Sequence, residues 1–153
     1  MLRLAVQYGV PRKGLPGPAS FRRWAEAALA GRRKEAEVAV RVVDRAEGAA
    51  LNQRYRGKAG PTNVLSFPFE APHGVDLPWL GDLVLCAPLV AEEALAQGKR
   101  PAAHWAHLVV HGILHLLGYD HQTEGEAAEM ERIEVEVLRG LGFDDPYGDM
   151  DST

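Results

Sequence analysis

The chain has 153 residues, of which 46% are hydrophobic and 25% are charged, as in an ordinary globular protein. This length predicts one domain over residues 1–153 with a substantial core, and a loose tail from about residue 149. The single cysteine, Cys86, excludes an internal disulfide and a multi-cysteine metal cluster, and favours a reducing cytoplasm and no disulfide-linked partner. We expect no signal peptide and no membrane contact, since histidines interrupt the longest apolar run.

The formal net charge of −4 hides an asymmetry between the two ends of the chain. Residues 1–60 hold 13 Lys and Arg against 5 Asp and Glu, whereas residues 122–153 hold 2 against 10. The basic half could therefore form a surface that faces phosphate groups, while the acidic end faces elsewhere. A solvated surface of mixed charge is the alternative.

Hydrophobic periodicity, helix caps and prolines predict alternating strands and helices along the chain. In chain order, a strand is expected at 2–8, a helix from Ser20 to about 30, a strand around 38–42 and a helix from Asp44 to about 55. Further strands are expected at 64–67 and 82–86, and further helices at 88–97, 101–117 and from Thr123 to about 141. This order predicts an α+β domain with one mixed sheet of about four strands packed by about five helices.

Five of the six histidines lie within residues 104–121. His111 and His115 are four residues apart, so on a helix they differ by about 40° around the axis and about 6 Å along it, and both can bind one ion. Gly118 is expected to end this helix, and a short turn can return His121 as a third ligand. His107 fits a core position or a contact to a ligand better, and His104 and His73 are expected to be structural or solvent-facing.

Three imidazole ligands without cysteine are typical of a catalytic metal site, because such a site keeps one coordination position open for water. A divalent ion would activate that water and polarise a carbonyl or phosphoryl oxygen, so hydrolysis is the expected chemistry. Zinc is the expected ion, although imidazoles also accept nickel, copper or iron. In zinc peptidases with the H-E-x-x-H motif, a glutamate follows the first histidine, but here Gly112 stands in that place.

Residues 111–121 read H-G-I-L-H-L-L-G-Y-D-H. This segment is similar to the H-G-x-L-H-L-x-G-Y-D-H signature of the YbeY family of bacterial endoribonucleases, and other segments also resemble that family. Residues 51–58 and 61–70 are similar to its other characteristic segment, residues 81–86 to its next strand, and residues 126–130 to the start of its last helix. The similarity covers roughly residues 37–147.

This resemblance implies a zincin-like fold with a central metal-binding helix, and a site in which His111, His115 and His121 bind one divalent metal ion. It also implies that Arg56 is the arginine essential for RNA cleavage. A guanidinium fixed beside a glycine turn is suited to clamping a phosphodiester and stabilising its charge. One departure is Ala59, which stands where the family commonly has an aspartate.

The function implied is a single-strand-specific, metal-dependent endoribonuclease of ribosomal RNA processing, at the 3′ end of 16S rRNA, and of 70S ribosome quality control. Single-stranded RNA, rRNA and ribosomal particles are the expected partners. Two other hypotheses stay open: a zinc metallopeptidase, disfavoured by Gly112, and a non-catalytic ribosome-assembly factor with a structural metal. The sequence identifies no general base, and it does not separate attack by metal-bound hydroxide from attack by a ribose 2′-hydroxyl.

Overall fold

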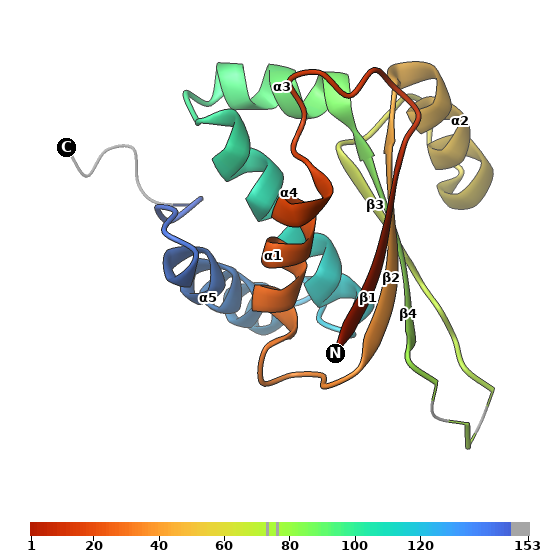
Figure 1. The fold of residues 1–153 in the computed structure, drawn as a ribbon, viewed down its shortest axis with the longest axis vertical. Coiled ribbons are helices and arrows are strands. Elements are labelled where there is room, and N and C mark those ends of the chain that lie inside the picture. Colours follow the sequence, from red (N-terminus) through yellow and green to blue (C-terminus); the bar gives the residue numbers. More distant parts are fainter. Residues whose placement is uncertain (73, 76, 148–153) are drawn as a thin grey trace.

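A computed structural model of the protein describes residues 1–72, 74–75 and 77–147, so His73 and the tail predicted from about residue 149 lie outside the described residues. Figure 1 shows an α+β fold, as predicted, in which one mixed sheet is packed by helices. In chain order the elements are β1 (Leu2–Tyr8), α1 (Pro18–Leu29), β2 (Ala36–Val43), α2 (Arg45–Arg56), β3 (Val64–Pro68), β4 (Trp79–Cys86), α3 (Ala87–Ala96), α4 (Pro101–Leu116) and α5 (Glu124–Gly140).

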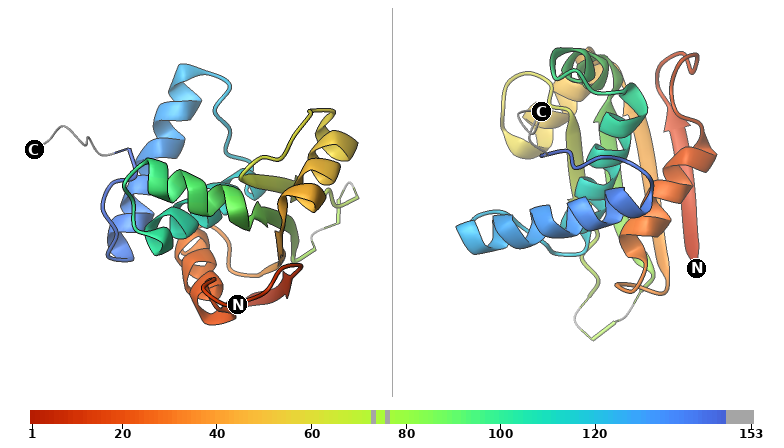
Figure 2. Two further views of the ribbon diagram at one scale, coloured as in Figure 1. Left: turned by 90° about the horizontal axis from the view of Figure 1, so that it is seen from above. Right: turned by 90° about the vertical axis from the view of Figure 1, so that its left-hand side faces the viewer.

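The sheet has four strands in the order β1-β2-β4-β3. The first three are parallel neighbours, and β3 pairs with β4 in the antiparallel direction at one edge. Helices α1, α3, α4 and α5 lie on one side of the sheet and α2 on the other (Figure 1). In the second view of Figure 2, α5 crosses α4 on the side of α4 that faces away from the sheet. Helix α4 is therefore the central element, between the sheet and α5.

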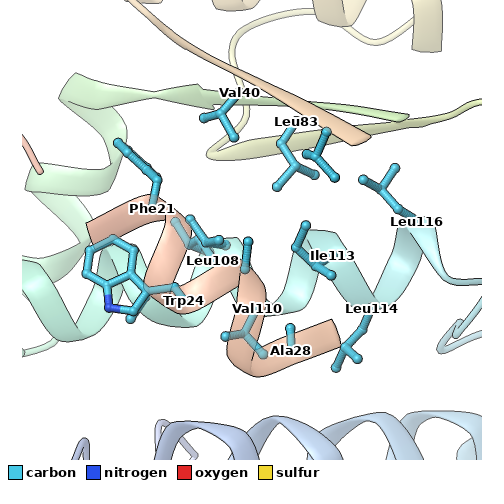
Figure 3. Packing of buried hydrophobic residues seen from close by; sticks show 14 of the residues in the cluster. Phe21, Trp24, Ala28, Val40, Leu83, Leu108, Val110, Ile113, Leu114 and Leu116 are labelled. Carbon is cyan, nitrogen blue, oxygen red and sulfur yellow. The ribbon is translucent and has the colours of Figure 1, made fainter. Parts of the chain in front are cut away.

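The main core fills the space between the sheet and the helices α1 and α4. Val40 of β2 and Leu83 of β4 point toward Ile113 on α4 (Figure 3), and all three side chains are fully or almost fully buried. Phe21 of α1 packs edge to face against Trp105 of α4, with ring centroids 5.9 Å apart. This burial holds α4 in one position against the sheet. Within the described residues, no helix has the length and hydropathy needed to cross a membrane.

Helix starts show where local signals decide and where they do not. The predicted capping box of α5 is present: the Thr123 side chain accepts from the Glu126 backbone, and the Glu126 side chain accepts from the Thr123 backbone. The predicted cap at Ser20 is wrong, because α1 already begins at Pro18 and Ser20 lies inside its first turn. Proline has a φ angle preset for the first helical position and has no N–H to be capped, so it starts this helix earlier.

Gly112 lets α4 lie unusually close to the sheet. A Cβ atom at this position would come within 2.7 Å of Leu83 Cδ2 and 3.3 Å of Ser66 Oγ. The Ser66 hydroxyl donates a hydrogen bond to the Gly112 carbonyl at 3.4 Å, which joins β3 directly to the middle of α4. A glutamate after the first histidine, as in the zinc peptidases, would collide with the sheet here. The glycine therefore has a packing reason of its own.

Candidate metal centre

The structure brings His111, His115 and His121 together at the C-terminal end of α4. One ring nitrogen from each residue can be chosen so that all three lie within 4.8 Å of one another. The ring centroids of His111 and His115 are 4.6 Å apart, and those of His115 and His121 are 5.1 Å apart. A transition metal that binds nitrogens at about 2.1 Å in tetrahedral geometry holds them more than about 3 Å apart, a separation that the 4.8 Å range includes.

The turn after α4 places His121 beside the helix that carries the other two histidines. Gly118 has a φ of 104°, which ends the helix in a conformation that other residues rarely adopt. Its N–H donates to His115 O and the N–H of Tyr119 donates to Leu114 O, both at 3.0 Å, which is the Schellman pattern. The Asp120 carboxylate accepts from the His121 backbone N–H at 2.7 Å. The predicted glycine stop thus has the geometry needed to return His121.

The electrostatics of this cluster suit a bound cation. Burial, together with the neighbouring His111 and His121, lowers the pKa of His115, so this imidazole stays neutral at physiological pH. A neutral imidazole has the free lone pair that a metal ion needs. His111 is half-buried and His121 is exposed, so the cluster opens to solvent on one side. A neutral His115 beside two further imidazoles, in a cluster that opens to solvent, fits a transition metal with an open coordination position.

A second cluster, not foreseen from the sequence, lies one turn earlier on α4. Glu134 of α5 is fully buried, and its carboxylate lies 2.9 Å from His107 Nε2 and 2.6 Å from His111 Nδ1. The Tyr147 hydroxyl donates to the same carboxylate. Burial alone would raise the pKa of Glu134, but the hydrogen bonds from His107 and His111 outweigh it and lower the pKa to about 2. Burial and the Glu134 carboxylate raise the pKa of Tyr147.

The sequence did contain a signal for Glu134. It occupies a position on the apolar stripe of α5, four residues after Met130 and four before Leu138, both of which are buried. A carboxylate on such a stripe must be paired, since burying it alone is costly. The partner could not be named from the sequence, because it comes from another helix.

His104 has a structural role, one of the two expected for it. Its side chain is buried, and its Nε2 lies 2.8 Å from Glu93 Oε1. Glu93, on α3, also accepts a hydrogen bond from Asn63 Nδ2 at 3.0 Å. The Asn63 side-chain oxygen in turn accepts from the backbone N–H of Val64 at 2.6 Å, where β3 begins. The network therefore ties α3, α4 and β3 together beside the histidine cluster.

Arg56 lines the same cleft as the histidine cluster. The cleft has a volume of about 760 Å³, and Arg56, Ser66 and Tyr147 line it together with the three clustered histidines. Arg56 is the last residue of α2, which Gly57 ends with a φ of 67°. The buried Asn52 side chain donates to the Gly60 carbonyl at 2.8 Å and so fixes the loop that follows Arg56. Ala59 is an exposed residue of this loop.

Part of the predicted basic surface is neutralised by neighbouring carboxylates. Arg41 Nη2 lies 2.9 Å from Glu47 Oε1, and Arg45 forms an ion pair with Glu92. The Glu47 pairing also explains why its side chain does not complete a capping box with Asp44, which caps α2 alone. Arg56, in contrast, is exposed at the cleft. Charge that can act on an anion is thus concentrated more narrowly than the sequence count indicates.

Comparison with known proteins agrees with this arrangement. The sequence model of the family described as "Endoribonuclease YbeY" matches residues 18–142. Proteins named Endoribonuclease YbeY from Xanthomonas axonopodis pv. citri and Stenotrophomonas maltophilia are each 59% identical to this chain over 150 residues, which is 95% of this chain and 93% of theirs. A solution structure of a Thermotoga maritima protein superposes with a TM-score of 0.61 at 28% identity, covering 99% of this chain and 97% of that one. The chain belongs to the YbeY endoribonuclease family.

Proposed function

We propose that this chain is a metal-dependent endoribonuclease that cleaves single-stranded RNA. We place its action in ribosomal RNA processing, at the 3′ end of 16S rRNA, and in 70S ribosome quality control in the cytoplasm. The observation that carries the proposal is that three histidines suited to a metal ion and an exposed arginine line one cleft. The relatives that are 59% identical carry the name Endoribonuclease YbeY, which supports RNA as the substrate.

We propose that His111, His115 and His121 bind one Zn²⁺ ion, with nickel or another transition metal as the alternative. The neutral state of His115 and the absence of cysteine beside the cluster favour an imidazole site with an open position. When bound, the ion supplies a Lewis acid that polarises a phosphoryl oxygen and lowers the pKa of water. The protein holds its three ligands on one helix end and one turn, which fixes where a substrate phosphate can approach.

Arg56, which lines the same cleft, is the proposed catalytic residue. Its guanidinium can donate two parallel hydrogen bonds to the non-bridging oxygens of a phosphodiester, which both orients the group and stabilises charge that grows during cleavage. Arg56 stands at the end of α2, where the hydrogen bond from Asn52 to Gly60 restrains the following loop. This restraint acts on the backbone beside Arg56, so it fixes the position from which the arginine side chain reaches into the cleft.

The shape of the cleft favours a flexible strand. An unpaired strand can bend one phosphodiester toward the histidines and Arg56 together, whereas an A-form duplex holds its phosphates in a fixed path. We therefore expect cleavage in the single-stranded segment of an RNA that contains one unpaired and one paired segment. Binding should weaken steeply with salt, because arginines and lysines displace counterions from phosphates.

The test is to label an RNA that contains one unpaired and one paired segment, and to incubate it with metal-loaded protein and with His115→Ala. A casein digestion is run in parallel. Cleavage of the unpaired segment by the wild type alone supports the proposal. Casein cleavage without RNA cleavage would instead identify a peptidase. If neither free RNA nor ribosomal particles are cleaved, the assembly factor with a structural metal becomes the better reading.

A further inference from the structure

Glu134 is a fully buried carboxylate in direct contact with a residue of the histidine cluster. Its helix, α5, otherwise presents Met130, Ile133 and Leu138 to the core, all buried. An ionised carboxylate can only accept hydrogen bonds, so every polar group around it must donate. Among the described residues, the groups that contact it are His107, His111 and the Tyr147 hydroxyl. The carboxylate therefore decides on which ring nitrogens these histidines carry their protons.

For His111 this has a direct chemical consequence. Glu134 Oε2 lies 2.6 Å from His111 Nδ1, so Nδ1 must carry the proton. The other ring nitrogen, Nε2, then keeps its lone pair, and His111 lines the cleft together with His115 and His121. We propose that Glu134 is a positioning residue that holds His111 in the tautomer and orientation in which Nε2 can bind metal. The inference rests on the three-histidine metal site of the proposed function and adds a residue to it.

The other carboxylate oxygen explains how Glu134 is itself held. Oε1 accepts from His107 Nε2 at 2.9 Å and from the Tyr147 hydroxyl. The ring of Tyr147 stands nearly perpendicular to that of His107, with centroids 5.2 Å apart. Tyr147 follows α5 on the segment that returns toward α4, and it lines the cleft. Tyr147 is thus joined to His111 by two hydrogen bonds that run through Glu134.

His107, His111 and Glu134 could also be regarded as a metal site of their own, since their donor atoms cluster within 4.8 Å. The distances argue against this. Glu134 lies 2.6 Å from His111 Nδ1 and 2.9 Å from His107 Nε2, which are direct hydrogen bonds. Ligand atoms bound to one ion at about 2.1 Å are held more than about 3 Å apart in tetrahedral geometry. The short contacts therefore describe shared protons, and the carboxylate acts on a ligand instead of on an ion.

The test compares Glu134→Gln with Glu136→Gln, two neutral substitutions on the same helix. Glu136 is exposed and pairs with Arg132 at 3.1 Å, so its loss leaves the cluster untouched. Zn²⁺ affinity is measured by competition with a chromophoric chelator, and the His111 tautomer in the metal-free protein by ¹⁵N imidazole NMR. We expect Glu134→Gln to bind Zn²⁺ about 10- to 100-fold more weakly. His111 should become a mixture of tautomers, while Glu136→Gln should match the wild type in both measurements.

Three other outcomes would separate the alternatives. Wild-type Zn²⁺ affinity and an unchanged tautomer in Glu134→Gln overturn the positioning role but leave the proposed function intact. No Zn²⁺ binding by the wild type overturns the proposed function first. A second equivalent of Zn²⁺ in the wild type that disappears in Glu134→Gln would make this cluster a metal site and also overturn the positioning role.

Should Glu134→Gln fail to fold, Tyr147→Phe gives the same comparison with a smaller change. It removes one hydrogen bond to Glu134 and keeps the ring against His107. We expect a several-fold loss of Zn²⁺ affinity with the thermal midpoint of the metal-free protein close to that of the wild type. An unchanged affinity in this variant would overturn the inference.

Discussion

Both ends of α4 carry histidines three or four residues apart, which is helical spacing, but their surroundings differ. At the N-terminal end, Nε2 of His104 contacts Glu93 and Nε2 of His107 contacts Glu134. At the C-terminal end, His115 faces His111 and His121, and the three line an open cleft. The comparison teaches that spacing alone does not make a histidine a candidate ligand: a ring nitrogen that no carboxylate holds must also face the neighbouring histidines.

His111 is the boundary between the two ends. One of its nitrogens contacts Glu134, as at the N-terminal end, and its ring lines the cleft, as at the C-terminal end. The gradient along α4 thus runs from a structural histidine, through a histidine with both roles, to a histidine available for binding. Substitutions at either end should therefore separate metal binding from stability.

The largest effect is expected on metal binding, in the variant His115→Ala at the C-terminal end of α4. Removing one of three proposed ligands should reduce bound metal from about one equivalent to a small fraction, because the two remaining imidazoles bind an ion far more weakly. Metal content after dialysis, measured by mass spectrometry, checks this. A tightly bound equivalent of metal in His115→Ala would show that the cleft holds its ion with other residues.

Arg56→Ala, at the same cleft, should retain its bound metal and its fold. Its turnover of single-stranded RNA should fall on the order of a hundredfold. Arg56→Lys should recover little, since an ammonium group does not reproduce a two-pronged contact. The matched control is Arg54→Ala on the same helix, whose guanidinium lies 5.3 Å from the ring centre of the exposed Tyr55. Equal turnover in the Arg54 and Arg56 variants would assign Arg56 to the solvated surface.

Substitution at the N-terminal end of α4 should instead lower the stability and leave metal binding unchanged. His104→Phe keeps the volume but loses the hydrogen bond to Glu93, so we expect about 1–3 kcal/mol less stability at neutral pH and an unchanged metal content. Burial lowers the pKa of His104 below its ordinary value of 6.5, so the unfolded wild type takes up a proton first as the pH falls.

The stability that the neutral His104 contributes is therefore lost as the pH falls below 6.5 toward the lower folded-state pKa. The difference between wild type and His104→Phe should narrow over that range. Urea denaturation of both proteins at a series of pH values measures it. A difference that widens toward acid pH would contradict the assigned environment of His104.

The smallest effect is expected in Gly112→Ala, as a loss of stability. Alanine favours a helix over glycine by about 1 kcal/mol, but its Cβ would press on the fully buried Leu83 at 2.7 Å. Overpacking of this kind costs about 1–3 kcal/mol, so a net loss of about 1 kcal/mol is expected. Thermal unfolding of the metal-free protein checks the sign, and a raised midpoint would show that α4 can move away from the sheet at no cost.

The sequence predicted the fold class and most elements because their signals are local. Strands β1 and β2 alternate in burial as their residues alternate in hydropathy, and the Thr123 box starts α5 where it was expected. The cap at Ser20 was wrong because Pro18 acts earlier in the same segment. Hydrophobic periodicity predicts where a helix lies. Where two start signals fall within three residues, their backbone geometry decides which one begins the helix.

The site also has features that local sequence predicts and features that it does not. The histidine spacing and the Gly118 stop indicated the cluster, and both are local features. Glu134 was missed because its partners come from α4 and from the C-terminal segment, which no window of sequence joins. Arg56 would have been assigned to the solvated surface on composition alone, and the resemblance to YbeY proteins directed attention to it. The structure then places Arg56 in the lining of the same cleft as the histidines.

The three clustered histidines lie within eleven residues of one another along the chain, and this has a consequence for how metal and folding are coupled. A segment so short can capture an ion before the rest of the protein has folded, as unfolded chains with neighbouring histidines do. A metal ion bound at the proposed site would then stabilise the native state by less than its affinity implies, because the denatured state would bind it too. Contacts from distant segments, such as that of Glu134 with His111, exist only in the folded protein. They alone distinguish the proposed native site from the same histidines binding an ion in the unfolded chain.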